Sequence, residues 1–291
     1  MKGIILAGGH GSRLAPMTTS TSKQLLPVYD KPMIYYPMSV LMRAGIKEVL
    51  IITTLEDQAR FINLLGDGED LGVHLEYVVQ REPKGLAEAF ILGRNFIGSD
   101  AVTLILGDNL FYGDGLSLAL KSAISKPEGA SIFSYYVENA ERYGVVDLDE
   151  NGRPRSIEEK PVHPKSNLAV TGLYVYDNDV VQMALDITPS KRNELEITDI
   201  NRLYFERGDL RVEQLGREVI WLDTGTPDAL LEAGELVRSL QHRQGLQIAC
   251  LEEISYRNGW IDDAKMSEIG NRLNSTEYGQ YILKLLNCEE S

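Results

Sequence analysis

The sequence has few of the residues that metal and thiol chemistry require. Only two of its 291 residues are cysteines, Cys250 and Cys288, and their spacing matches no zinc-binding pattern. We therefore expect two reduced thiols in a cytoplasmic protein and no structural zinc. None of the four histidines has metal-ligand spacing relative to another histidine.

Nucleophile motifs and long apolar runs are also missing. The chain has no G-x-S-x-G elbow, no cysteine and histidine setting for covalent catalysis, and neither the dinucleotide fingerprint nor the P-loop pattern. These absences disfavour covalent catalysis, a dehydrogenase and a P-loop NTPase. No apolar run approaches the ~18 residues of a membrane span. The first apolar run is also too short for a signal peptide.

Positive charge is scarce. The chain has 29 Lys and Arg against 43 Asp and Glu, a formal net charge of −14. A field of this sign repels nucleic acids and anionic membranes, so we expect neither as a partner. An anionic substrate would need a local group of cations. The apolar content of 43% is that of a soluble globular protein with a sizeable core.

Apolar strands alternate with amphipathic helices over roughly the first half of the chain. We expect strands at 3–7, 47–53, 73–80 and 102–106, and helices at 33–44, 57–65 and 85–97. This alternation predicts an α/β fold with a Rossmann-like, mixed but mostly parallel central sheet flanked by helices. Ligands bind such sheets at the carboxyl ends of the strands.

The pattern becomes rich in strands after residue 130. Strands are expected at 131–137, 144–148, 155–158 and 171–176, with a hairpin turn at Asn151-Gly152. Further helices are expected at 179–185 and 197–207, and strands at 212–215 and 218–222. Thr226-Pro227-Asp228 is typical of a helix start, and that helix should extend to Arg243.

No linker interrupts the first ~225 residues. We expect one catalytic domain over 1–243, with halves of about 1–130 and 131–226. The helical segment 244–291 should pack on that domain or at a subunit contact.

A glycine loop follows the first strand. Gly8, Gly9 and Gly11 allow backbone N–H groups to approach an anion closely, and Arg13 adds a charge suited to a phosphate. The alternative is a tight turn with no ligand. With other cations nearby, the loop predicts a phosphate site.

Two acidic residues stand just past apolar strands, Asp108 and Asp223. Two carboxylates from separate strands can hold Mg²⁺ while the ion keeps waters and phosphate oxygens. Either residue alone is more often a turn or cap residue. Lys23 and Lys160 are the candidate local cations, although most lysines are solvated surface residues. Together these groups favour metal-assisted, direct nucleotidyl transfer, which needs positioning and charge neutralisation more than a protein nucleophile.

Over essentially its whole length the chain resembles the glucose-1-phosphate thymidylyltransferases, a family of sugar nucleotidyltransferases. The resemblance is carried by Gly8-Gly9-His10-Gly11-Ser12-Arg13-Leu14, Ser22-Lys23-Gln24-Leu25-Leu26-Pro27, Gln80 with Pro83 and Gly85-Leu86-Ala87, Gly107-Asp108-Asn109, Glu159-Lys160-Pro161, Val170-Thr171-Gly172-Leu173-Tyr174 and Trp221-Leu222-Asp223-Thr224-Gly225-Thr226. It implies the nucleotide-diphospho-sugar transferase type of fold. The first half of the domain would bind the nucleotide and the second, strand-rich half the sugar.

The resemblance also implies a role for each matched residue. The triphosphate of dTTP would be held by Gly8, Gly11, Ser12 and Arg13, with Lys23 on the leaving phosphates and Gln24 also at the nucleotide. The base would be read by Gln80 and Gly85, and Mg²⁺ would be bound by Asp108 and Asp223. The sugar of glucose 1-phosphate would be lined by Tyr143, Gly144, Glu159 and Val170, and its phosphate would be held by Lys160. The catalytic groups would be Arg13, Lys23, Asp108 and Lys160.

The implied reaction converts dTTP and α-D-glucose 1-phosphate into dTDP-glucose and pyrophosphate. It would feed dTDP-rhamnose or dTDP-amino-sugar synthesis for cell-surface polysaccharide. The family is typically tetrameric, with a site for an inhibitory dTDP-sugar at a subunit interface. The alternatives are the same chemistry with UTP or another sugar 1-phosphate, and a nucleotide-sugar sensor without catalysis.

Overall fold

The computed structural model describes residues 1–9 and 11–288, and the side chains of 287 and 288 are not described. His10 of the glycine loop and the thiol of Cys288 therefore lie outside the described residues. In the described part of the chain, nine strands form one sheet in the order β10-β9-β11-β6-β1-β4-β5, with β8 on β11 and β12 on β8. These strands are β1 (Lys2–Ala7), β4 (Glu48–Thr53), β5 (His74–Val79), β6 (Val102–Leu106), β8 (Ala130–Tyr136), β9 (Gly144–Leu148), β10 (Pro154–Glu159), β11 (Leu168–Tyr176) and β12 (Leu210–Gln214).

The parallel part of the sheet is built on β1. Strand β1 pairs in parallel with β4 and β6, and β4 pairs in parallel with β5. Ile4 and Leu6 belong to the apolar core on one face, and Ile5 and Ala7 to the core on the other. Because both faces are covered, these strands are continuous apolar runs, and the sequence prediction of a mostly parallel centre is confirmed.

Strand β11 joins the parallel part to the antiparallel part. It pairs antiparallel with β6, β8 and β9. Strands β9 and β10 form the predicted hairpin around Asn151-Gly152. The side chain of Asp149 closes the turn, because its Oδ1 accepts the backbone N–H groups of Asn151 and Arg153, each at 2.8 Å.

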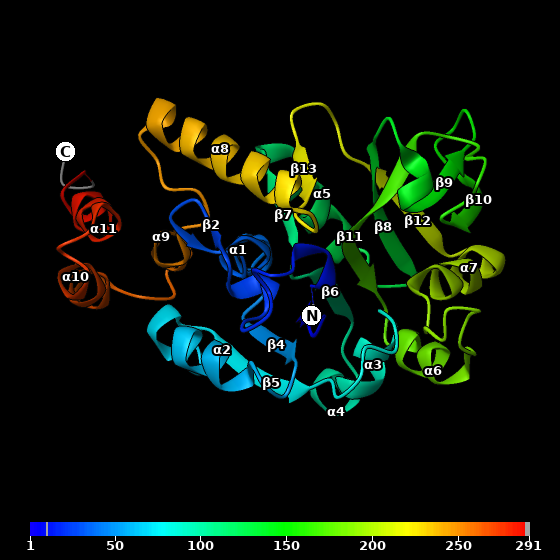
Figure 1. Ribbon diagram of the computed structural model, residues 1–291, viewed down its shortest axis with the longest axis horizontal. Coiled ribbons are helices and arrows are strands. Elements are labelled where there is room, and N and C mark those ends of the chain that lie inside the picture. The colour runs from blue at the N-terminus through cyan, green and yellow to red at the C-terminus, as the bar shows by residue number, and fades with distance from the viewer. Residues whose placement is uncertain (10, 289–291) are drawn as a thin grey trace.

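Helices cover both faces of the sheet, as Figure 1 shows. Helices α1, α2 and α5 contribute to one core, and α3, α4, α6 and α7 to the other. The helices are α1 (Tyr35–Arg43), α2 (Gln58–Leu65), α3 (Glu88–Leu92), α4 (Arg94–Ile97), α5 (Asp114–Ile124), α6 (Asp179–Asp186), α7 (Ile197–Arg207), α8 (Pro227–Gln244), α9 (Leu251–Arg257), α10 (Asp263–Arg272) and α11 (Glu277–Cys288).

Two segments differ from the sequence expectation. The helix expected at 85–97 is divided into α3 and α4 at Gly93, where a Cβ would lie 3.1 Å from Ile4 Cδ1. The helix therefore packs closely on β1 at that glycine. The segment after Asp108, for which no element was expected, forms β7 (Asn109–Tyr112) and then α5.

Strand β13 (Ile220–Asp223) lies outside the main sheet, although the sequence placed Asp223 at the edge of that sheet. It pairs antiparallel with β7 alone, with Asp223 opposite Asn109. The physical reason is that β7 leaves the main sheet immediately after Asp108 and offers its own edge to β13. A second small ladder joins β2 (Pro27–Val28) and β3 (Lys31–Pro32).

The C-terminal part is helical, as expected. Helix α8 begins at the predicted N-cap, where the Thr226 hydroxyl accepts the N–H of Ala229 at 3.3 Å. Helices α10 and α11 pack against each other at the end of the molecule opposite β9 and β10 (Figure 1). None of the helices in residues 1–9 and 11–288 combines the length and the apolar character that crossing a membrane requires.

Candidate active site

Two adjoining cavities open beside the carboxyl ends of β1 and β6. The larger has a volume of about 550 Å³ and the smaller about 210 Å³. Both are lined by Leu86, Leu106, Asp108 and Glu194. Asp108 therefore stands at the boundary between two spaces that could hold the two reacting molecules.

The two predicted carboxylates come together from different ladders. Asp108 follows β6, and Asp223 ends β13; both line the larger cavity. Thr224 joins the two segments, because its N–H and its hydroxyl donate to the carbonyl oxygen of Asp108 at 3.1 Å and 2.7 Å. The register of β7 and β13 thus brings Asp223 next to the end of β6.

The surroundings shift the pKa values of the two carboxyl groups in opposite directions. Burial raises the pKa of Asp108, but the Lys23 ammonium, in direct contact with Oδ2, more than offsets it and holds the pKa below its usual range. Burial and the negative charge of Asp108 raise the pKa of Asp223, although Arg13 and Lys23 oppose this. The site therefore carries a carboxylate whose charge is not fully compensated.

The donor set fits a divalent cation of the magnesium type. Mg²⁺ is commonly held by one or two carboxylates, with waters and substrate phosphates completing its shell. Within the described residues no three His, Cys, Asp or Glu side chains gather as a metal cluster, so a protein-only cage is not built here. The two carboxylates and the uncompensated charge on Asp223 suit an ion that arrives with a phosphate.

Arg13 lies beside this pair. It is exposed in the short 3₁₀ helix η1 (Ser12–Leu14), which follows Gly11 at a left-handed φ of 62°. A Cβ on Gly225 would lie 2.6 Å from Arg13 Nη2 and 3.0 Å from Asp223 Oδ1. The glycine is therefore what allows the guanidinium to approach the carboxylate.

The smaller cavity brings together Lys23, Gln24, Gln80 and Gly85. Gln24 and Gln80 are 2% and 5% exposed. The Ser22 hydroxyl donates to Gln24 Oε1 at 2.6 Å, which fixes that amide. Close packing also explains why residue 8 is a glycine, because a Cβ there would lie 2.3 Å from Gln80 Oε1.

Gly85 connects the smaller cavity to the loop before α7. It has φ 104°, and a Cβ there would lie 2.3 Å from the carbonyl oxygen of Leu195. The neighbouring backbone groups are paired, since Leu195 N donates to Lys84 O at 2.7 Å and Ala87 N to Leu195 O at 3.2 Å. Only glycine fits this approach without displacing Leu195.

The larger cavity brings together Tyr143, Gly144, Glu159, Lys160 and Val170. Lys160 follows β10 at φ 42°, and its N–H donates to Tyr143 O at 3.0 Å. A Cβ on Gly144 would lie 3.5 Å from Glu159 Oε2. The structure thus gathers these five predicted residues around one space.

Several lining residues were not predicted as site residues. Arg192 donates to Glu159 Oε1 at 3.2 Å and to Glu196 Oε2 at 2.8 Å, and the Thr198 hydroxyl donates to Glu159 Oε2 at 2.6 Å. These partners come from an irregular polar stretch and the start of α7, and nothing in the sequence marks them as neighbours of Glu159.

Asn109 and Trp221 also went unassigned, although each stands within two residues of a predicted aspartate. Asn109 is 3% exposed, and its Oδ1 accepts Trp221 Nε1 at 2.6 Å and Gly172 N at 3.0 Å. The indole stands edge-on to Tyr143, with 5.2 Å between ring centroids. Their position beside Asp108 and Asp223 was the signal that could have found them.

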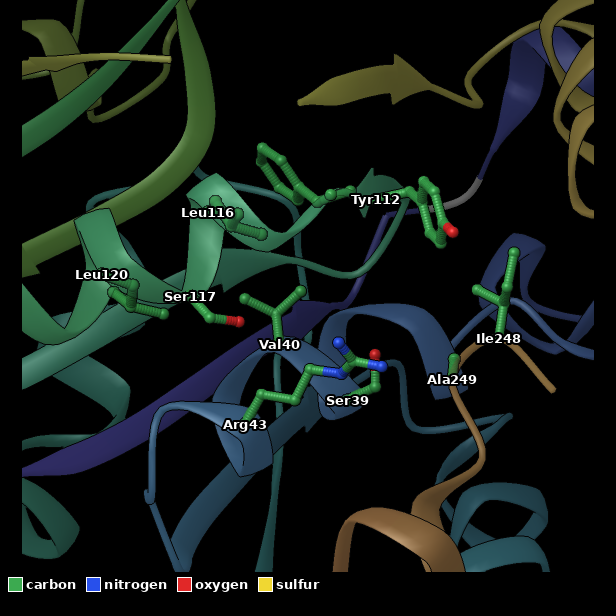
Figure 2. Close-up of a pocket in the computed structure, with 11 residues that line it drawn as sticks. Ser39, Val40, Arg43, Tyr112, Leu116, Ser117, Leu120, Ile248 and Ala249 are labelled. Atoms are coloured by element: carbon green, nitrogen blue, oxygen red, sulfur yellow. The ribbon is translucent and has the colours of Figure 1, made fainter. Parts of the chain in front are cut away.

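A further pocket lies away from these groups, between α1, α5 and the segment before α9. Figure 2 shows Ser39, Val40 and Arg43 on one side of it and Leu116, Ser117 and Leu120 on another. Its volume is about 30 Å³, which is room for one or two waters. This pocket is therefore too small for a nucleotide or a sugar phosphate.

The chain matches one family model and many known proteins. The "Nucleotidyl transferase" model matches residues 2–239. A glucose-1-phosphate thymidylyltransferase of Neisseria meningitidis is 57% identical over 98% of this chain and 99% of its own length, and one of Mycobacterium tuberculosis is 53% identical over the same shares.

Solved structures agree with the sequence relatives. A Bacillus anthracis structure described as a glucose-1-phosphate thymidylyltransferase with sucrose is 42% identical, with a TM-score of 0.76 over 82% of this chain and 95% of its own. A UDP-glucose pyrophosphorylase with UDP-glucose is 28% identical, with a TM-score of 0.72 over 82% of this chain and 98% of its own. The expected fold is confirmed.

Proposed function

The chain belongs to the nucleotidyl transferase family and, within it, to the glucose-1-phosphate thymidylyltransferases, and on that premise we propose that it transfers a thymidylyl group from dTTP to α-D-glucose 1-phosphate. The products are dTDP-glucose and pyrophosphate. The observation that carries this proposal is the carboxylate pair, of which Asp108 lines both cavities and Asp223 the larger, together with Arg13 and Lys160 in the larger cavity and Lys23 in the smaller.

The smaller cavity takes the nucleotide in this proposal. The base lies between Gln80 and Gly85, and the glycine loop with Ser12 and Arg13 holds the triphosphate through backbone N–H groups and the guanidinium. Lys23 leaves Asp108 to bind the phosphates that depart as pyrophosphate. Gln24, held by Ser22, supports this side of the site.

The larger cavity takes glucose 1-phosphate. Glu159, fixed by Thr198 and Arg192, accepts sugar hydroxyls, while Tyr143, Gly144 and Val170 line the ring. Lys160 holds the sugar phosphate so that one of its oxygens forms a bond to the α-phosphorus of dTTP. The bond from that phosphorus to the leaving pyrophosphate breaks in the same step.

Asp108 and Asp223 hold Mg²⁺ in this proposal. When bound, the ion neutralises charge on the α-phosphate and so lowers the repulsion toward the incoming phosphate. The two residues contribute by position, because Asp108 stands where the nucleotide and sugar-phosphate cavities meet and Asp223 lines the sugar-phosphate cavity beside it.

The wider expectations belong to the same proposal and rest on the resemblance. Residues 1–243 would divide into nucleotide and sugar halves. Four chains would assemble, with a dTDP-sugar inhibitor site at a subunit interface. The enzyme would work in the cytoplasm, where its product feeds dTDP-sugar synthesis. Sedimentation of the purified protein and inhibition by dTDP-sugars test the assembly and the inhibitor site.

A pyrophosphate-release assay over a matrix of nucleotides and sugar 1-phosphates tests the reaction. We expect dTTP with glucose 1-phosphate to give the highest kcat/KM. UTP is the main competitor, because UDP-glucose pyrophosphorylases share the fold and a methyl group is worth only about 10- to 200-fold in discrimination. A much higher kcat/KM for another pair contradicts the substrate assignment, and no release with any pair would indicate a sensor.

A further inference from the structure

Glu88 is a carboxylate, singled out by no motif, that contacts Gln80 of the smaller cavity. It is the first residue of α3, and its Oε2 accepts the amide Nε2–H of Gln80 at 2.7 Å and the backbone N–H of Lys84 at 3.3 Å. Gln80 is nearly buried and lines the cavity. The Glu88 carboxylate therefore holds the amino end of the Gln80 side chain.

This contact decides which end of the Gln80 amide stays available to a ligand. An ionised carboxylate only accepts hydrogen bonds, so it binds the amino end of an amide and not the carbonyl end. The carbonyl oxygen Oε1 is then turned toward Gly8, where a side chain would have met it at 2.3 Å. Without Glu88, the amide could present either end.

We propose that Glu88 is a positioning residue that makes Gln80 present a hydrogen-bond acceptor to the nucleobase. The inference rests on the proposed function, in which the base lies beside Gln80. A fixed acceptor pairs with the N3–H of thymine or uracil. It meets the unprotonated N3 of cytosine with lone pair against lone pair. Glu88 thus acts through Gln80 to select pyrimidine bases that carry N3–H.

The test is steady-state kinetics of Glu88→Ala with dTTP and dCTP. We expect KM for dTTP to rise about tenfold, which is the loss of one oriented hydrogen bond, while kcat and KM for glucose 1-phosphate stay within about twofold. The preference for dTTP over dCTP should fall by about tenfold or more. Glu88→Gln, which keeps the size and an acceptor, should recover most of the dTTP affinity.

A double variant separates positioning from a general structural effect. Because Glu88 acts through Gln80, the combined Glu88→Ala and Gln80→Ala variant should match Gln80→Ala alone. Glu82→Ala is the matched control, since Glu82 is an exposed acid in the loop before α3 whose ion pair, at 3.5 Å, is with Lys84 Nζ. It should keep the wild-type constants.

Additive losses in the double variant, or an unchanged base preference in Glu88→Ala, overturn the inference. Should Glu88→Ala fail to fold, Glu88→Met keeps the packing volume and is judged by the same constants. Wild-type protein that uses dCTP as well as dTTP contradicts the inference but leaves nucleotidyl transfer standing. Wild-type protein that releases no pyrophosphate from any pyrimidine triphosphate contradicts the proposed function itself.

Discussion

Replacing Asp223 with asparagine separates the catalytic use of this carboxylate from its effect on stability. Asparagine keeps the shape and removes the charge. Burial and the charge of Asp108 raise the pKa of Asp223, so its ionised form is disfavoured in the folded protein. Such a group costs stability progressively as the pH rises from its unfolded pKa to its folded pKa. The full cost remains at higher pH, and it is absent only where the group is protonated in both states. Asp223→Asn should therefore be at least as stable as the wild type at pH 7.5 when metal and nucleotide are absent.

Activity should respond in the opposite direction. Asp223 lines the larger cavity as the second carboxylate beside Asp108, and loss of one preorganised charge-stabilising group costs about 10²–10³ in kcat, or roughly 3–4 kcal/mol. Ligand stabilisation should fall as well, because a weaker Mg²⁺ site binds Mg²⁺ and dTTP less tightly together. The assays are thermal unfolding with and without Mg²⁺ and dTTP, and pyrophosphate release.

Asp228→Asn is the matched control. Asp228 is exposed in the first turn of α8, five residues after Asp223, and should lose only its interaction with the helix dipole, about 0.3–1 kcal/mol. Its kcat should equal that of the wild type. If Asp223→Asn turns over within about threefold of the wild type, or loses stability in the absence of ligands, the account of this residue is wrong.

Three further substitutions or probes test other parts of the structure. Gly85→Ala should raise KM for dTTP and lower stability by more than the ~1–2 kcal/mol of a left-handed alanine, because the Cβ meets Leu195 O. Gly245→Ala, at a left-handed φ of 69° and ψ of 21° with open space around it, should show only the smaller stability loss by chemical denaturation. Thr226→Ala should lose about 1 kcal/mol of stability in the same assay with kcat unchanged, and a large loss of activity would show that the cap also shapes the site. Burial and the charge of Glu252 raise the pKa of the Cys250 thiol. In a Cys288→Ser variant, Cys250 should therefore resist thiol reagents at pH 8 until denaturant is added. Rapid labelling of Cys250 in the native protein would contradict its burial.

The sequence predicts those parts of the fold whose residues face apolar surroundings on both sides. Strands β1, β4 and β6 are continuous apolar runs because both faces are covered, and their length of five or six residues favours strands over buried helices. Strand β7 escaped prediction because its four residues are too few to show a period. Helix α5 has 11 residues and buries Leu116, Leu120 and Ala123 at helical spacing, so its signal was present in the sequence and was overlooked.

The site is predictable where chemistry follows a strand directly. Asp108 stands just past the parallel strand β6, so its place at the ligand edge follows from the sheet. Lys160 follows the antiparallel strand β10, so the same rule does not place it. Contacts between distant segments do not follow in this way. The Asn109–Trp221 hydrogen bond joins residues 112 apart, and the Arg192–Glu159 ion pair joins residues 33 apart. Only tertiary packing brings such partners together.

A crystal structure with dTDP-glucose and Mg²⁺ tests most directly whether the two cavities are halves of one reaction site. We predict thymine in the smaller cavity within hydrogen-bond distance of Gln80, the glucosyl ring in the larger cavity beside Glu159, and the diphosphate next to Asp108. A thymine in the larger cavity, or a nucleotide sugar bound with its diphosphate away from Asp108, would contradict the account.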